Sequence, residues 1–219
     1  MSSSIATWTS VYPPRVSERP LVLASASPRR AELLRSAGVE FTVHAVDCDE
    51  SWRPGESAIQ YVQRVAAAKA LLAAELLREQ APAPLILAAD TTVWLALDEE
   101  PLQKPVDREH ATAMIRQLTR GEPHWTATAC AFARPDLDPM LVAELVVTTT
   151  VRMRTFDERQ FARFIGPYLD AGDWLGKAGA YAIQGRAAGF VESIEGSYTT
   201  VVGLPLAQVL AKLEELAGK

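Results

Sequence analysis

The most informative stretch of the chain reads Leu21-Val22-Leu23-Ala24-Ser25-Ala26-Ser27-Pro28-Arg29-Arg30. Its first four residues are apolar and predict a buried strand, whereas Pro28 suits the first position of a helix that Ser27 is placed to cap. The first turn of such a helix leaves backbone N–H groups without partners, and the two arginines add guanidinium groups suited to phosphate oxygens. The stretch therefore predicts a strand that leads into an anion-binding helix. An ordinary capped helix with solvated arginines fits the same residues.

Outward from this stretch, strand and helix signals alternate. A helix over 28–37 and a strand over 41–46 give a β-α-β opening. A long amphipathic helix over 57–79 carries Lys69, and 85–95 reads as one bent or interrupted strand with Asp90 in its middle. The other elements expected are helices over 107–119 and 157–165, strands over 124–133, 141–154 and 189–194, a strand ending at residue 202, and a helix from residue 204. Because both hairpin and crossover connections occur, the fold class expected is α/β, with a mixed twisted sheet and flanking helices.

Composition and charge narrow the classes of partner. The chain has 219 residues and a formal net charge of −5, which argues against a nucleic acid polymer or an anionic membrane and leaves room for a small phosphorylated ligand. No apolar run approaches a membrane span. Cys48 and Cys130 are too few for a disulfide scaffold, so a cytoplasmic location is expected. Residues 1–20 are rich in Ser, Thr and Pro and predict a disordered extension, which leaves 21–219 as the folded domain.

The charged residues suit phosphate chemistry. The candidate cations are Arg29, Arg30, Lys69, Lys104 and Lys177, and the candidate acids are Glu32, Asp47, Asp49, Glu50 and Asp90. Cations hold phosphates, carboxylates hold a hard divalent ion through oxygen, and one carboxylate can deprotonate a water molecule. For most of these residues a solvated surface position is the ordinary alternative. Asp90 differs, because an acid between two apolar and β-branched runs needs a hydrogen bond or a cation once it is buried.

Several motifs, in order along the chain, resemble those of the Maf family of nucleoside triphosphate pyrophosphatases. They are Ser25-x-Ser27-Pro28-Arg29-Arg30-x-Glu32, Asp90-Thr91, Lys104-Pro105, Lys177-Ala178-Gly179-Ala180-Tyr181-x-Ile183-Gln184-Gly185, and Glu195-Gly196-Ser197-Tyr198 leading to Val202-Gly203-Leu204-Pro205. The resemblance implies a two-lobed α/β fold around a central cleft, related to the inosine triphosphatase architecture. It implies hydrolysis of a nucleoside triphosphate to the monophosphate and pyrophosphate with a magnesium or manganese cofactor, and it is compatible with a homodimer.

The resemblance also implies roles for single residues. Asp90 matches the family's general base, and Glu50 matches a cleft acid that would help Asp90 to hold the metal. The residues that match the holders of the triphosphate are Ser25, Arg30, Lys69 and Lys104. Gly176 departs from the pattern, since many relatives carry Asp at this place.

Substrate choice is expected to depend on Arg29, Thr91 and Gln184. These residues match the branch of the family that resembles enzymes for dTTP and UTP, whereas the branch for 7-methyl-GTP typically shows Trp, Gln and Glu. Gln184 offers both a donor and an acceptor to the edge of a uracil or thymine. We therefore expect a dTTP and UTP pyrophosphatase. The alternatives are a 7-methyl-GTP pyrophosphatase and a non-catalytic nucleotide-binding regulator of cell division.

Overall fold

The computed structural model describes residues 19–95 and 100–217. Its strands form one sheet in the order β2-β1-β3-β4-β5-β6. They are β1 (Leu21–Leu23), β2 (Thr42–Val43), β3 (Leu85–Leu95), β4 (His124–Ala133), β5 (Leu141–Met153) and β6 (Val191–Glu195). β1 pairs in parallel with β2 and β3, whereas β3, β4, β5 and β6 pair antiparallel in sequence. The mixed sheet expected from the sequence is confirmed.

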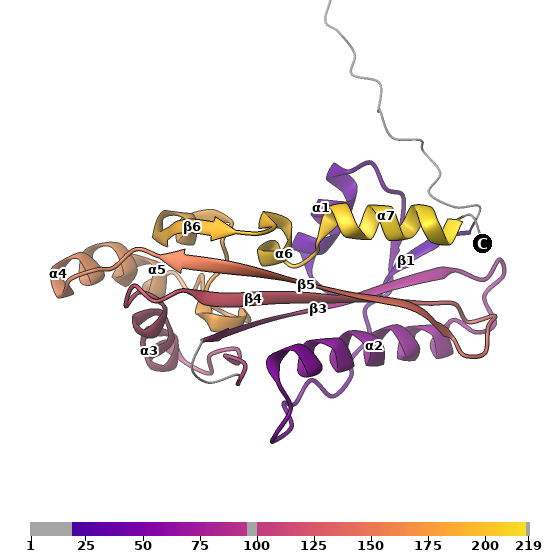
Figure 1. Ribbon diagram of the computed structural model, residues 1–219, viewed down its shortest axis with the longest axis horizontal. Coiled ribbons are helices and arrows are strands. Elements are labelled where there is room, and N and C mark those ends of the chain that lie inside the picture. Colours follow the sequence, from indigo (N-terminus) through magenta and orange to yellow (C-terminus); the bar gives the residue numbers. More distant parts are fainter. Residues whose placement is uncertain (1–18, 96–99, 218–219) are drawn as a thin grey trace, which may run out of the picture.

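Helices cover both faces of the long strands (Figure 1). The helix on one face is α2 (Ala58–Leu76), and those on the other face are α1 (Pro28–Ser36), α6 (Tyr198–Val202) and α7 (Leu206–Ala217). Side chains of β3 alternate between the two layers, as the pleat of a strand requires. Ile86 and Ala88 pack in the apolar cluster with α2, and Leu85 and Leu87 pack in the cluster with α1 and α7. This alternation decides which layer each later residue of β3 meets.

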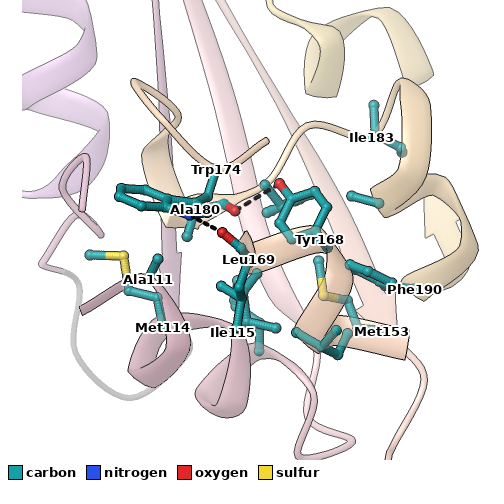
Figure 2. Packing of buried hydrophobic residues seen from close by; sticks show 14 of the residues in the cluster. Ala111, Met114, Ile115, Met153, Tyr168, Leu169, Trp174, Ala180, Ile183 and Phe190 are labelled. Atoms are coloured by element: carbon teal, nitrogen blue, oxygen red, sulfur yellow. Dashed lines mark hydrogen bonds between the residues drawn. The ribbon is translucent and has the colours of Figure 1, made fainter. Parts of the chain in front are cut away.

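A third apolar cluster covers the other end of the long strands. Its helical segments include α3 (Arg108–Leu118), η1 (Phe161–Ile165), α5 (Gly166–Asp170), η2 (Ala178–Ala180) and η3 (Gly185–Phe190). The short helix α4 (Glu158–Gln160) leads directly into η1 and has no buried residue. Figure 2 shows how two hydrogen bonds tie α5 to the loop that follows it. Trp174 Nε1 donates to the Leu169 carbonyl at 2.9 Å, and Tyr168 Oη donates to the Ala180 carbonyl at 3.0 Å. The segment that contains Lys177 is therefore anchored in a packed core.

Some local expectations differ from the structure. The strand expected to end at residue 202 is wrong, because Ser197 Oγ accepts a hydrogen bond from the Thr200 N–H and residues Tyr198–Val202 form α6. The strand expected over 41–46 shortens to β2, whose two residues are exposed. Ser27 stands at the N-cap position of α1, but its side chain makes no capping hydrogen bond.

The remaining expected helices and strands are present, with their ends shifted by a few residues. Of the N-terminal extension expected over residues 1–20, all but Arg19 and Pro20 lies outside the described residues. No helix in the part of the chain that the structure describes is long and apolar enough to cross a membrane.

Candidate active site

A gap in strand pairing creates a cavity at the edge of β3. β1 ends at Leu23, and its last backbone contact with β3 runs from the Ala24 N–H to the Leu87 carbonyl at 2.8 Å. Further along the same edge, the Leu102 N–H donates to the Val93 carbonyl. Between these two contacts no described strand pairs with this edge of β3, and a cavity of about 340 Å³ opens there. β3 itself runs without a break from Leu85 to Leu95, so the interruption considered for 85–95 is absent. It is the pairing with β1 that stops part-way along β3.

Most of the residues predicted to form the site line this cavity. Its wall includes Ser25, Arg29, Arg30, Glu50, Lys69, Asp90, Thr91 and Lys104. Gln184 is not part of this wall; it lies half-buried immediately before η3. A second cavity of about 350 Å³ adjoins the first and shares Glu50, Asp90 and Lys104 with it. The residues expected to bind substrate or metal, apart from Gln184, therefore lie on the wall of one cavity, whereas the other candidate acids Glu32, Asp47 and Asp49 do not.

Asp90 and Lys69 face each other across the layer between β3 and α2. Asp90 continues the even-numbered series of Ile86 and Ala88, so its side chain points toward α2. Lys69 lies on the buried stripe of α2, one helical turn after Val65, and only 7% of its surface is exposed. The solvated position that is ordinary for a mid-helix lysine is therefore excluded. Lys69 Nζ donates to Asp90 Oδ1 at 2.8 Å.

Glu50 extends this ion pair into a chain of four charges. Lys69 Nζ lies 2.6 Å from Glu50 Oε1, and Lys104 Nζ lies 2.8 Å from Glu50 Oε2. Burial raises the pKa of Glu50, but hydrogen bonds from Lys104 and Lys69 outweigh burial and hold this pKa at about 2. Burial likewise lowers the pKa of Lys69, but the charge and hydrogen bonds of Asp90 and Glu50 raise it above the ordinary value. Both groups are therefore ionised at neutral pH.

Arg30 is fixed on the other side of the cavity by three acceptors. Its Nε donates to the Gly203 carbonyl at 2.8 Å, one terminal nitrogen donates to Ser25 Oγ at 2.9 Å, and the other donates to Thr91 Oγ1 at 3.0 Å. Thr91 Oγ1 is also hydrogen-bonded to Thr128 Oγ1 at 2.9 Å. The hydroxyls of Ser25 and Thr91 thus orient Arg30. Each terminal nitrogen of Arg30 keeps a second N–H for a ligand.

Gly203 permits this arrangement through its backbone. Its φ of +128° is one that L side chains rarely adopt, and a Cβ at this position would lie 3.5 Å from both Arg30 Nε and Thr91 Oγ1. A glycine therefore suits the turn after α6, where the carbonyl accepts from Arg30.

Two further cations lie on the cavity wall. Arg29 Nε donates to the Val202 carbonyl at 3.4 Å, and Lys177 Nζ donates to the Leu175 carbonyl at 3.2 Å. Burial, followed by the neighbouring charge of Arg30, lowers the pKa of Arg29, and burial followed by the charge of Arg29 lowers that of Lys177. The sequence offers Lys177 as a candidate cation but does not predict that it binds substrate. The motif that begins with Lys177 is the feature that could have indicated this.

Comparison with known proteins assigns this chain to a family. Residues 20–216 match the family described as Maf-like protein. The chain belongs to the Maf family. A Maf relative from Hahella chejuensis, named dTTP/UTP pyrophosphatase, is 43% identical over 205 residues, which cover 92% of this chain and 94% of that protein. A relative of the same name from Myxococcus xanthus is 44% identical over 194 residues, which cover 89% of this chain and 91% of that protein.

A solved structure also aligns with this Maf chain. It is a crystal structure titled nucleoside-triphosphatase / dITP/XTP pyrophosphatase from Mycobacterium abscessus, which covers 69% of this chain and 93% of its own at 17% identity. Its TM-score with this chain is 0.37.

Proposed function

We propose that the protein is a pyrophosphatase that hydrolyses dTTP and UTP to the nucleoside monophosphate and pyrophosphate. The observation that carries this proposal is the buried pair of Asp90 and Lys69 on the wall of a cavity that also presents Arg29 and Arg30. A carboxylate among phosphate-binding cations suits the transfer of a phosphoryl group to water. The names of the Maf relatives at 43% and 44% identity support the same substrates.

In this proposal, Asp90 takes a proton from the attacking water molecule. Asp90 Oδ1 is bonded to Lys69, whereas Oδ2 has no hydrogen-bond partner within residues 19–95 and 100–217. The water oxygen forms a bond to the α-phosphorus while the bond from that phosphorus to the bridging oxygen breaks, and the electron pair leaves with pyrophosphate. The proton passes through Asp90 to solvent. The cations of the cavity offset the charge that the leaving group gains.

The residues present fit a magnesium or manganese ion that shares its coordination with the substrate. The described residues contain no group of three or more His, Cys, Asp or Glu side chains suited to a metal. Glu50 and Asp90 both lie on the cavity wall and both contact Lys69. These two carboxylates would hold the ion together with phosphate oxygens, as is common for Mg²⁺. The ion would supply Lewis-acid polarisation of the phosphate oxygens.

The preference for pyrimidines is the finer part of the proposal. Arg29 lines the cavity directly, whereas the Thr91 hydroxyl contacts Arg30 and Thr128 and would influence the substrate through Arg30. Gln184 is outside the wall, but Tyr181 of the same motif lines it. The proposal therefore places the base toward Tyr181, where it would approach Gln184.

A cytoplasmic location and a homodimer stay predictions.

The test is a measurement of pyrophosphate release from dTTP, UTP, CTP, GTP, ATP and 7-methyl-GTP in magnesium and manganese buffers. The proposal predicts release from dTTP and UTP at rates well above those of the other nucleotides. Release from 7-methyl-GTP alone would contradict the pyrimidine assignment. Nucleotide binding without release from any substrate would contradict the enzymatic proposal and favour a nucleotide-binding regulator.

A further inference from the structure

The cavity wall is divided by charge. Its two acids, Glu50 and Asp90, pair with Lys69 and Lys104. The other cations on the wall are Arg29, Arg30 and Lys177, and none of these has an ion-pair partner in the described part of the chain. One part of the cavity is therefore close to neutral, and another carries an excess of positive charge.

The excess positive charge is only partly offset by a nearby acid. Asp173 is the acid that acts on Lys177, but its carboxylate lies 3.7 Å from Arg186 Nε and is shared with that residue. Burial and the charge of Arg30 lower the pKa of Arg29, and burial and the charge of Arg29 lower the pKa of Lys177 despite the opposing effect of Asp173. A bound anion would remove this repulsion.

These three cations are held in place before any ligand binds. Arg30 is fixed by its three acceptors, and Arg29 precedes it in the first turn of α1. Lys177 follows a segment anchored by Trp174, and its own backbone N–H donates to the Trp174 carbonyl at 3.2 Å. The Ala180 N–H in turn donates to the Lys177 carbonyl at 3.0 Å (the anchoring core is shown in Figure 2). Preorganised cations of this kind strengthen the binding of a charged group.

We propose that Arg29, Arg30 and Lys177 form the subsite that holds the leaving pyrophosphate, and that Lys177 is a substrate-binding residue. Two linked phosphate groups carry roughly three negative charges at neutral pH, which matches three unpaired cations. With the β- and γ-phosphates in this subsite, the α-phosphorus lies toward Asp90 and Lys69 on the same cavity wall. This inference rests on the proposed function, because it assumes that pyrophosphate is the leaving group.

Calorimetric titration with inorganic pyrophosphate tests the subsite without turnover. The comparison uses the full chain, the variants Lys177→Gln and Lys177→Arg, and titration with dTMP as the other product, all in magnesium buffer. Lys177→Gln should weaken pyrophosphate binding by about 10- to 100-fold, the range expected for loss of a charge-assisted hydrogen bond, and should leave the affinity for dTMP unchanged. Lys177→Arg should restore most of the affinity. Lys212→Gln is the matched control, because Lys212 pairs with Glu215 on α7 and lies outside the cavity wall.

A second pair of variants tests the charge without changing Lys177. Gly176 lies on the cavity wall with a φ of +67°, and a Cβ at this position would meet no atom within 4 Å. Asp and Asn tolerate this backbone region better than other side chains, so Gly176→Asp and Gly176→Asn carry the same strain and differ in charge. Gly176→Asp should bind pyrophosphate about tenfold more weakly than Gly176→Asn, because its carboxylate neutralises part of the subsite. The comparison of Gly176→Asp with Gly176→Asn tests the pyrophosphate subsite even if Lys177→Gln fails to fold.

The outcomes separate the subsite from the reaction. Wild-type affinity for pyrophosphate in Lys177→Gln, or an equal loss of pyrophosphate and dTMP binding, would overturn the subsite even in a protein that hydrolyses dTTP. Equal pyrophosphate affinities in Gly176→Asp and Gly176→Asn would overturn it as well. A protein that binds pyrophosphate through Lys177 but releases none from any triphosphate would retain the subsite and contradict the proposed function.

Discussion

Arg30 is the residue on which the geometry of the cavity depends most. Its guanidinium joins three segments that are far apart in the sequence: the loop after β1 through Ser25, β3 through Thr91, and the turn after α6 through Gly203. Only 8% of its surface is exposed, so these bonds form in a poorly solvated place. A planar fork can satisfy three acceptors at once, and a lysine cannot reproduce it.

Arg30→Lys should therefore lower both stability and activity although the positive charge is kept. We expect the free energy of unfolding to fall by about 1–3 kcal/mol, because buried acceptors lose donors. Urea denaturation measures this change, with Arg35→Lys on the same helix as the control. An unchanged midpoint in Arg30→Lys would show that the three bonds do not contribute to stability.

At the scale of single elements, the start of β4 is tied to the loop after η2. His124 is fully buried, and its Nε2 lies 2.8 Å from Tyr181 Oη, with the rings packed edge to face. His124 Nδ1 has no hydrogen-bond partner among the described residues. Because buried N–H groups without a partner are rarer in proteins than buried acceptors without one, we assign the proton to Nε2, which then donates to Tyr181. This contact holds Tyr181 against the cavity.

His124 should make the fold less stable as the pH is lowered from about 6.5 to about 4. Burial lowers the pKa of His124 from 6.5 to about 4. As the pH falls, the unfolded chain takes up this proton first, so the stabilisation is complete above pH 6.5 and is lost as the pH falls toward 4. The full effect is on the order of 3 kcal/mol.

Denaturation midpoints measured between pH 7.5 and pH 4 test this sign, with His124→Gln as the comparison because its amide can still donate to Tyr181. The wild type should lose more stability than His124→Gln across this range. Parallel pH curves for the two proteins would contradict the assignment of a neutral His124.

The sequence predicted the elements that have strong periodic signals, but it failed where a contact between distant residues determines the local structure. The strands over 124–133 and 141–154 and the capped helix from Asp107 were predicted because alternation and capping are local. The run Tyr198–Val202 is rich in β-branched residues and reads as a strand, yet Ser197 caps it as α6. Asp90 was predicted to be functional because an acid in an apolar run is itself a signal. Its partner Lys69 could not be separated from a solvated lysine without knowing which face of α2 meets the sheet.

At the scale of the whole molecule, the site exists because a short strand pairs with a much longer one. The short parallel strand β1 stops beside Leu87, near the start of the long strand β3, and the cavity occupies the edge that β1 leaves open. Figure 1 shows α1 and α2 on opposite sides of this sheet, so Arg30 and Lys69 approach the cavity from opposite layers. No local pattern encodes where one strand ends relative to another. For the same reason the sequence did not reveal that Gln184 lies outside the cavity wall or that Lys177 lies on it.

Removal of divalent metal should stop the reaction without unfolding the protein. Glu50 and Asp90 each keep a lysine partner when no metal is bound, so neither of these two carboxylates is left without a counter-charge. Pyrophosphate release from dTTP should be abolished by EDTA and restored by excess magnesium or manganese, while the circular dichroism spectrum stays unchanged. Full activity in EDTA would contradict a metal held by Glu50 and Asp90.

The central claim is that Asp90 activates water in a pyrophosphatase site, and the rate of pyrophosphate release by Asp90→Asn tests it most directly. Asn keeps an oxygen that can accept from Lys69, so the variant should fold with a melting temperature close to that of the wild type. Loss of the proton acceptor should lower the turnover of dTTP and UTP by about 100-fold or more. A folded Asp90→Asn protein that releases pyrophosphate at the wild-type rate would contradict the account.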